Sequence, residues 1–338
     1  MKDNACLLVT GGAGFIGSAF IRTVLRLSEF TGRIVNVDKL TYAANLGNLK
    51  GVHGHPRYRF IQADINRMDL METICLESEV DAIVHFAAET HVDRSIAAAT
   101  PFVEANIKGT MSMLEVVRKN PHIHFHHIST DEVYGSLGES GWFTERSSYR
   151  PNSPYSATKA ASDHLVRAYA HTYNLSTTIS HCSNNYGPGQ HPEKFIPLMI
   201  LNCIAQKPLP IYGRGVNIRD WLYVEDHAEA IWTILKKGKK GETYNIGGNV
   251  ELSNLQLVES ITALLAARFH VDPEFYRRLI RFVSDRPGHD FRYAIDASKI
   301  QKTLGWTPRW ALKKGLQKTI QWYTSSHMQK TRQSIPMS

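Results

Sequence analysis

Residues 11–17 read GGAGFIG, and they lie between an apolar run at residues 5–10 and a helix-like run at residues 18–27. The stretch contains the spacing G-x-G-x-x-G, starting at Gly12, in the strand-to-helix setting that a dinucleotide-binding fingerprint requires. Glycines there let the main chain approach a pyrophosphate, whose charge is met by N–H groups at the helix N-terminus. The stretch therefore predicts the first strand, turn and helix of a Rossmann-type fold.

The second predicted strand supports NAD as the dinucleotide. Residues 33–37 are largely apolar and end in Asp38, about 20 residues past the last glycine. A carboxylate at that position can accept hydrogen bonds from ribose hydroxyls and would repel a 2′-phosphate, so we expect NAD in preference to NADP. The positive charge of Lys39 beside it weakens this preference.

Three more apolar runs, residues 58–63, 81–86 and 123–129, alternate with runs of helical spacing at residues 69–79 and 101–119. This alternation predicts an α/β protein with a doubly wound parallel sheet. Small residues after the fourth strand would let a cofactor lie close to the main chain.

The polar triplet Thr130, Asp131 and Glu132 follows the fifth predicted strand. At the carboxyl end of a parallel strand, both acids can face a bound substrate. The alternative is a helix N-cap or a solvated loop, where these residue types are common. On its own the triplet favours the alternative, and the rest of the sequence has to decide.

Tyr155 and Lys159 are four residues apart at the start of a predicted helix, and hence on one face of it. A neighbouring ammonium favours the phenolate, which would make Tyr155 a usable base near neutral pH. The pattern is common by chance, but after a dinucleotide fingerprint it predicts a catalytic pair.

From about Cys182 the chain becomes richer in loops, which predicts a smaller, mixed α/β substrate lobe. We expect a Rossmann domain at residues 1–182, to which later segments can return, a substrate lobe at 183–324 and a polar tail at 325–338. Lys194, Arg219 and Arg286 are candidates for binding a diphosphate.

The composition limits the classes of protein to which the chain can belong. With 338 residues, 43% of them hydrophobic and 21% charged, a globular protein is expected. The widely spaced Cys6, Cys75, Cys182 and Cys203 predict free thiols, and without a signal-peptide or membrane-spanning run we expect a cytoplasmic protein. The formal charge is +8, but the basic run at residues 236–240 lacks aromatic neighbours, which favours a solvated loop over nucleic-acid binding.

A histidine-rich run at positions 124, 126 and 127 raises the question of a metal site. In a strand the first two side chains point to one face and the third to the other. No carboxylate stands at ligand spacing, so we expect structural or surface histidines and no metal.

The chain resembles the extended short-chain dehydrogenase/reductases, and within them the dTDP-glucose 4,6-dehydratase family, from about residue 5 to Tyr323. The resemblance rests on the glycine turn and on five further motifs. These are DKLT at 38–41, HVDRS at 91–95, TDEVYG at 130–135, SNNYGP at 183–188 and RPGHD at 286–290, together with Tyr155 and Lys159. The acidic pair after Thr130 is the feature that related epimerases lack.

The resemblance implies a reaction on a nucleotide hexose. Thr130 and Tyr155 would contact the sugar, with Tyr155 accepting the 4-hydroxyl proton while hydride passes from C4 to NAD. Lys159 would hold the phenolate and the nicotinamide ribose. Glu132 would remove the C5 proton, Asp131 would protonate the departing 6-hydroxyl, and hydride would return to C6, so that NAD stays bound and is regenerated.

The resemblance also implies two sets of contacts. Residues expected to contact NAD are Gly11, Gly14, Phe15, Ile16, Gly17, Asp38, Lys39, Leu40, Thr41, Asp64, Ile65, Phe86, Ala87, Ala88, Thr90, Tyr155, Lys159 and Asn185. Residues expected to contact the nucleotide sugar are Thr90, Thr130, Asn184, Lys194, Phe195, Pro210, Tyr212, Arg219, Asn254, Arg286 and His289.

Several positions depart from the family pattern. Ala105 stands where the family usually has Thr, Thr90 where it usually has Ser, and the stretch around Gly189 departs from the aromatic residue that is usual there. The alternatives left open are a UDP- or GDP-hexose 4,6-dehydratase, a UDP-hexose 4-epimerase and, more remotely, a non-catalytic NAD-binding protein. A homodimer packed through residues 101–117 and 160–173 is also expected from the resemblance.

Overall fold

The computed structural model describes residues 1–333, and side-chain burial through residue 325. A seven-stranded parallel sheet forms its larger part, in the order β10-β6-β5-β4-β1-β2-β3. The strands are β1 (Cys6–Thr10), β2 (Arg33–Asp38), β3 (Tyr58–Gln62), β4 (Ala82–His85), β5 (His124–Thr130), β6 (Thr177–Cys182) and β10 (Thr243–Ile246). The first five coincide closely with the strands expected from the sequence.

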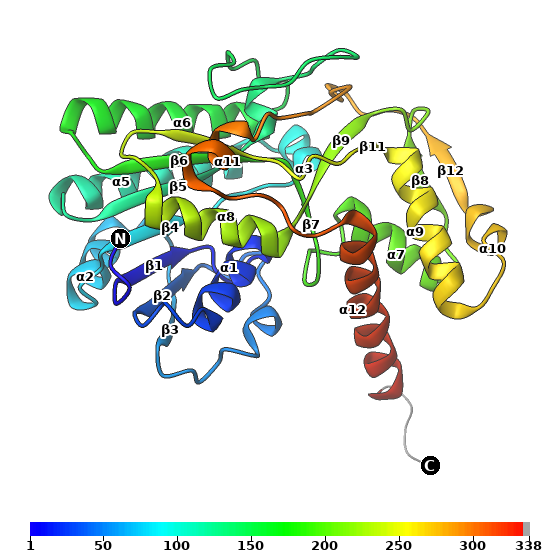
Figure 1. Cartoon of the computed structure of the whole chain (residues 1–338), viewed down its shortest axis with the longest axis horizontal. Helices are drawn as coiled ribbons and strands as arrows, with labels where there is room; N and C mark the ends of the chain where they lie inside the picture. The colour runs from blue at the N-terminus through cyan, green and yellow to red at the C-terminus, as the bar shows by residue number, and fades with distance from the viewer. Residues whose placement is uncertain (334–338) are drawn as a thin grey trace.

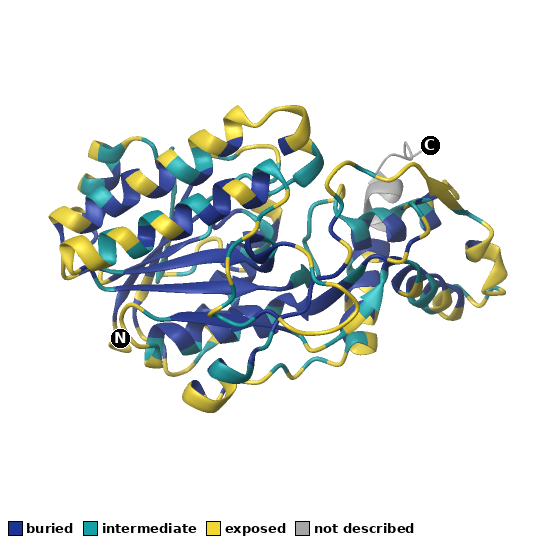
Figure 2. Cartoon of the chain, turned by 90° about the horizontal axis from the view of Figure 1, so that it is seen from above, coloured by how far each residue is buried: buried dark blue, intermediate teal, exposed yellow. Residues whose placement is uncertain are grey.

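Helices from distant parts of the chain cover the two faces of this sheet (Figure 1). One face packs against α1 (Phe15–Arg26), α8 (Val224–Lys237) and α11 (Ser298–Leu304), and the other against α2 (Met68–Glu77), α5 (Gly109–Lys119) and α6 (Pro154–Tyr173). Side chains of β1 alternate between the faces, Leu7 and Val9 to the first and Cys6 and Leu8 to the second. Figure 2 shows the buried strands enclosed by helices whose outer faces are exposed.

The predicted helix at residues 101–119 is interrupted. It consists of α4 (Thr100–Phe102), the π-helical segment η2 (Val103–Lys108) and α5. Short π-helical segments inside longer helices occur frequently at functional sites. Two 3₁₀ turns, η1 (Leu46–Leu49) and η3 (Asp131–Tyr134), and helix α3 (Val92–Ala97) lie in connections that follow strands of the large sheet.

A smaller lobe lies beyond the carboxyl ends of the strands (Figure 1). Its two small sheets are built from β7 (Asn184–Tyr186), β9 (Ile218–Tyr223) and β11 (Glu251–Ser253), and from β8 (Leu209–Tyr212) and β12 (Ile280–Val283). Helices α7 (Phe195–Ile204), α9 (Asn254–Phe269), α10 (Glu274–Arg277) and α12 (Leu312–Gln333) accompany them. The mixed α/β lobe expected from the sequence is therefore present, while β10 and α8 return to the large sheet. The predicted domain boundary after residue 182 stays a prediction.

Helix α12 continues to Gln333, and the polar tail expected from residue 325 stays a prediction. Leu316, Ile320 and Tyr323 repeat at helical spacing and are buried in the core of the smaller lobe, which anchors the start of this helix. The last five residues, 334–338, lie outside the described residues. Among the described helices, none is both long enough and apolar enough to cross a membrane.

Candidate active site

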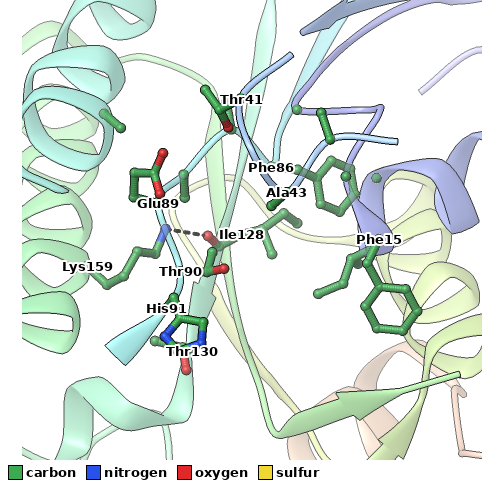
Figure 3. Close-up of a pocket in the computed structure, with 18 of the residues that line it drawn as sticks. Phe15, Thr41, Ala43, Phe86, Glu89, Thr90, His91, Ile128, Thr130 and Lys159 are labelled. Carbon is green, nitrogen blue, oxygen red and sulfur yellow. Dashed lines mark hydrogen bonds between the residues drawn. The ribbon is translucent and has the colours of Figure 1, made fainter. Parts of the chain in front are cut away.

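A cavity of about 430 Å³ lies at the carboxyl ends of β1, β2, β4 and β5. Figure 3 shows Phe86 from the end of β4, Ile128 and Thr130 from β5 and Lys159 from α6 around it. Most of the residues predicted to contact cofactor or sugar line this cavity. They are Gly11, Gly14, Phe15, Ile16, Gly17, Asp38, Lys39, Thr41, Asp64, Ile65, Phe86, Ala87, Ala88, Thr90, Thr130, Asp131, Glu132, Tyr155, Lys159, Asn184, Asn185 and Lys194.

The glycine turn is packed too tightly for side chains. Gly11 has φ +69, and a Cβ there would lie 2.7 Å from the main chain of Ala87. A Cβ on Gly17 would lie 2.5 Å from the carbonyl oxygen of Gly11. Helix α1 begins after Gly14 without a side-chain cap, so its first N–H groups are open to an anion. These features fit the pyrophosphate of a dinucleotide.

Asp38 and Lys39 both fit NAD. The Asp38 carboxylate accepts hydrogen bonds from Ala13 N (2.9 Å) and Leu40 N (2.8 Å), which fixes it beside the glycine turn. Lys39 Nζ lies 2.6 Å from an Asp64 carboxylate oxygen. The carboxylate of Asp64 therefore balances the positive charge of Lys39. This charge had weakened the predicted preference for NAD over NADP, and the ion pair offsets it.

The acidic triplet satisfies both interpretations of the sequence. Thr130 caps η3, because its hydroxyl accepts a hydrogen bond from Glu132 N at 3.3 Å, and the two acids also line the cavity. Burial raises the pKa of Asp131 well above its usual range, and the carboxyl groups of Glu132 and Asp220 add to the effect. Asp131 Oδ2 is buried and has no hydrogen-bond partner among the described residues. Asp131 is therefore suited to carry a proton.

Glu132 lies in a different electrostatic setting from its neighbour. Burial raises its pKa, but the positive charges of Arg286, Lys194 and Arg219 act in the opposite direction. Three cations therefore favour the carboxylate of Glu132, whereas desolvation and nearby acids favour the protonated form of Asp131. Adjacent carboxyl groups whose environments differ in this way can act as an acid and a base.

Tyr155 and Lys159 lie together as expected, but the expected direction of the tyrosine shift is wrong. Burial, followed by the charge of Glu132, raises the pKa of Tyr155 well above its ordinary value. Lys159 Nζ donates a hydrogen bond to Ile128 O at 2.7 Å (Figure 3), and burial lowers its pKa to about 8. At this buried position the loss of hydration outweighs the hydrogen bond with Thr130, which lowers the pKa of Tyr155.

The predicted diphosphate-binding cations are held by protein partners. Lys194 Nζ donates to Thr90 O at 2.9 Å at the cavity wall, and Arg286 lies 3.3 Å from Asp93. Arg219 is buried, donates to Asp290 O at 2.9 Å and stacks over Tyr293 at 4.2 Å. The predicted contact residues outside the cavity lining are Leu40, Phe195, Pro210, Tyr212, Arg219, Asn254, Arg286 and His289.

Several residues of the cavity wall were not expected from the sequence. Tyr42, Glu89, His91, Gln190 and His191 line it from connections that flank predicted contact residues. Their signal was position alone, since loops after parallel strands form the ligand-binding edge of such sheets.

Comparison with known proteins gives the chain its family. A family model described as GDP-mannose 4,6 dehydratase matches residues 8–319. The dTDP-glucose 4,6-dehydratase of Neisseria meningitidis serogroup B is 52% identical over 330 residues, covering 94% of this chain and 92% of the relative. The chain belongs to the dTDP-glucose 4,6-dehydratase family. The family member from Escherichia coli is 51% identical over 341 residues and covers 95% of this chain and 94% of its own.

Solved structures of this family have the same fold as the chain. A dTDP-glucose 4,6-dehydratase from Bacillus anthracis in complex with NAD superposes with a TM-score of 0.88 at 47% identity, covering 96% of this chain and 98% of that one. A UDP-glucose 4-epimerase from Thermotoga maritima with UDP-glucose superposes almost as well, with a TM-score of 0.86, but at 26% identity over 95% and 99% of the two chains. The shared fold does not separate dehydratase from epimerase, whereas sequence identity favours the dehydratase family.

Proposed function

We propose that the chain is an NAD-dependent enzyme that converts dTDP-glucose to dTDP-4-dehydro-6-deoxyglucose and water. Family membership supports this reaction. The observation that carries it is the presence of Asp131 and Glu132 in one cavity with Tyr155, Lys159 and the glycine turn. A simple alcohol dehydrogenation needs no pair of carboxylic acids in addition to the tyrosine and the lysine. Elimination of water, in contrast, needs both a base and an acid.

The residues that would hold NAD are those of the glycine turn, Asp38, Asp64 and the small residues after β4. When bound, NAD supplies oxidation of the sugar at C4 and later reduction at C6 within one turnover. The chain supplies the proton transfers. Because burial raises its pKa, Tyr155 has to lose its own proton before it can take the proton of the 4-hydroxyl. Thr130, next to it on the cavity wall, would orient that hydroxyl.

The acidic pair would carry the elimination. The proton at C5 becomes acidic once C4 is a carbonyl, and Glu132, whose carboxylate three cations favour, would remove it. Asp131, which burial keeps protonated, would donate its proton to the departing 6-hydroxyl. One proton is removed from C5 and one is added to the leaving hydroxyl, so that a single water leaves.

Transfer of a label tests this reaction against its nearest rival. With dTDP-glucose deuterated at C4, we expect the deuterium at C6 of a product that has lost one water, detected by mass spectrometry and NMR. Deuterium that remains at C4, with no loss of water, would show a 4-epimerase instead. UDP-, GDP- and CDP-hexoses are assayed in parallel as the control for the nucleotide. A chain that binds NAD but turns over neither dTDP-glucose nor any of these hexoses would be a non-catalytic binding protein.

We also propose a homodimer that packs through residues 101–117, which include η2 and most of α5, and through residues 160–173 of α6. Val103 and Met111 expose 44% and 42% of their surface there, although most apolar residues of α5 cover the sheet. Met111→Glu is expected to convert a dimer into a monomer in light scattering after size-exclusion chromatography. Phe282→Glu, on the more exposed strand β12, is the matched control and should leave the mass unchanged. A monomeric unmodified chain would contradict the proposal.

A cytoplasmic location is proposed as well. Cys6, Cys75, Cys182 and Cys203 are free and buried, and free thiols of this kind are typical of a reducing compartment. Recovery of the protein in a membrane or secreted fraction after cell fractionation would contradict it.

A further inference from the structure

A buried carboxylate that the reaction above does not use lies under the catalytic lysine. Asp163 is fully buried on α6, four residues after Lys159 and eight after Tyr155, so the three share one helix face. Arg167 continues the same row, which places alternating charges at positions 159, 163 and 167. Of these residues, Tyr155 and Lys159 were predicted from the sequence, whereas Asp163 and Arg167 were not.

Four polar side chains converge on the Asp163 carboxylate. Ser129 and Tyr149 each donate to Oδ2 at 2.9 Å, and His181 Nε2 lies 2.8 Å from the same oxygen. His127 Nε2 lies 3.3 Å from Oδ1. Burial by itself would raise the pKa of Asp163, but the neighbouring imidazoles of His127 and His181 outweigh it and hold the pKa below its usual range. Asp163 is therefore a fixed negative charge in the core.

His127 lies between this charge and the lysine. Its Nε2 is 3.4 Å from Lys159 Nζ and 3.3 Å from Asp163 Oδ1. Burial, followed by the charge of Lys159, lowers the pKa of His127 to about 4, so the imidazole is neutral at neutral pH. The neutral ring separates the ammonium from the carboxylate and adds no charge of its own. Its Nε2 can accept from Lys159 or donate to Asp163, but not both at once.

Resting on the function proposed above, we propose that Asp163 is the buried counter-charge of Lys159 and acts by its charge, across the neutral ring of His127, as a positioning residue for the catalytic pair. Burial favours the neutral amine, and the Asp163 charge opposes that preference. Ile128 O holds the same ammonium from β5, which fixes its direction. The other titratable groups around Lys159 are Tyr155 on α6, Cys182 at the end of β6 and His85 on β4.

Asp163→Asn tests the proposal by removing the charge while keeping the size of the side chain. The pKa of Lys159 is about 8 in the unchanged chain. Without the negative charge it should fall by on the order of one pH unit, because a nearby carboxylate stabilises the ammonium. The falling, alkaline limb of turnover against pH should move to lower pH by the same amount. A purely structural Asp163 would lower turnover at every pH and leave the limb in place.

A second measurement is independent of turnover. The holoenzyme is produced with lysine that carries carbon-13 at its ε-carbon, and its NMR spectrum is recorded as a function of pH. The signal that is missing from the spectrum of Lys159→Arg belongs to Lys159, so its titration reports this one ammonium. The titration midpoint should fall in Asp163→Asn even if dTDP-glucose proves not to be the substrate, so failure of this proposal and failure of the proposed function are distinguishable.

Two further variants complete the design. His127→Leu removes the imidazole that contacts both Lys159 and Asp163, and it should lower the titration midpoint of Lys159 as well. This variant keeps the proposal testable if Asp163→Asn does not fold. Asp226→Asn is the matched control, because that carboxylate is equally buried but accepts hydrogen bonds from Arg309 N and Trp310 N, each at 3.0 Å, at the start of the chain segment leading to α12. An unchanged midpoint in a folded Asp163→Asn holoenzyme would overturn the proposal.

Discussion

Tyr155→Phe is expected to lower turnover of dTDP-glucose by about 10²- to 10⁴-fold, the usual effect of removing a general base. Tyr155 lines the cavity beside Thr130, whereas Asp131 and Glu132 are assigned to the later elimination, so the variant should leave the 4-hydroxyl proton without its acceptor. Phenylalanine keeps the ring that packs at 6.4 Å from Phe102, so folding and NAD content should be preserved. Turnover is measured as formation of the 4-dehydro-6-deoxy product by chromatography.

The matched control for this variant is on the same helix. Tyr169→Phe removes a hydroxyl that donates to Glu115 at 2.7 Å on the outer part of α6, away from the cavity lining. It should retain turnover close to that of the unchanged chain. If Tyr155→Phe also retained full turnover, Tyr155 would not be the base, and another cavity residue would have to take the proton.

Glu132→Gln is expected to stop the reaction after its first stage and to lower overall turnover by about 10²- to 10⁴-fold. Glutamine is nearly the same size and cannot accept the C5 proton, whereas oxidation at C4 depends on Tyr155 and does not require Glu132. Stopped-flow measurement of the near-ultraviolet absorbance of reduced NAD should therefore show a rise that persists, where the unchanged chain shows at most a brief transient.

A control variant and an isotope-exchange measurement test the role of Glu132 further. Glu139→Gln changes an exposed acid in the loop after η3 and should behave as the unchanged chain. Deuterium exchange at C5 from heavy water should be lost in Glu132→Gln, because removal of that proton is the step that it blocks. A folded Glu132→Gln variant that binds substrate but gives no absorbance change would show that Glu132 is needed before C4 is oxidised, which would contradict its role as the C5 base.

Much of the fold was predictable because its signals are local. Residues 11–17 and the apolar runs on either side predicted the first strand, turn and helix, and the structure confirms them. The spacing of Tyr155 and Lys159 likewise placed both on one face of α6, and Thr130, Asp131 and Glu132 line the expected edge of the sheet. Turn geometry and helical periodicity depend on a few neighbouring residues, so the sequence determines them directly.

The missed features depend on contacts between distant segments. Asp64 offsets the charge of Lys39 only because β3 pairs beside β2 in register. Helix α12 is anchored in the core of the smaller lobe through Leu316, Ile320 and Tyr323, a contact that was not predicted from the sequence. Neither pairing nor packing can be read from the composition of the segment concerned.

The sequence by itself determined the first five strands of the Rossmann-type sheet, the glycine turn and many of the residues that line the cavity. Only the tertiary structure decided their protonation. It raised the pKa of Tyr155, lowered that of Lys159 and brought Asp163 and His127 beneath the lysine from α6 and β5. Spacing along the chain is set by local backbone geometry, whereas desolvation and charge are summed over every element that packs around a group.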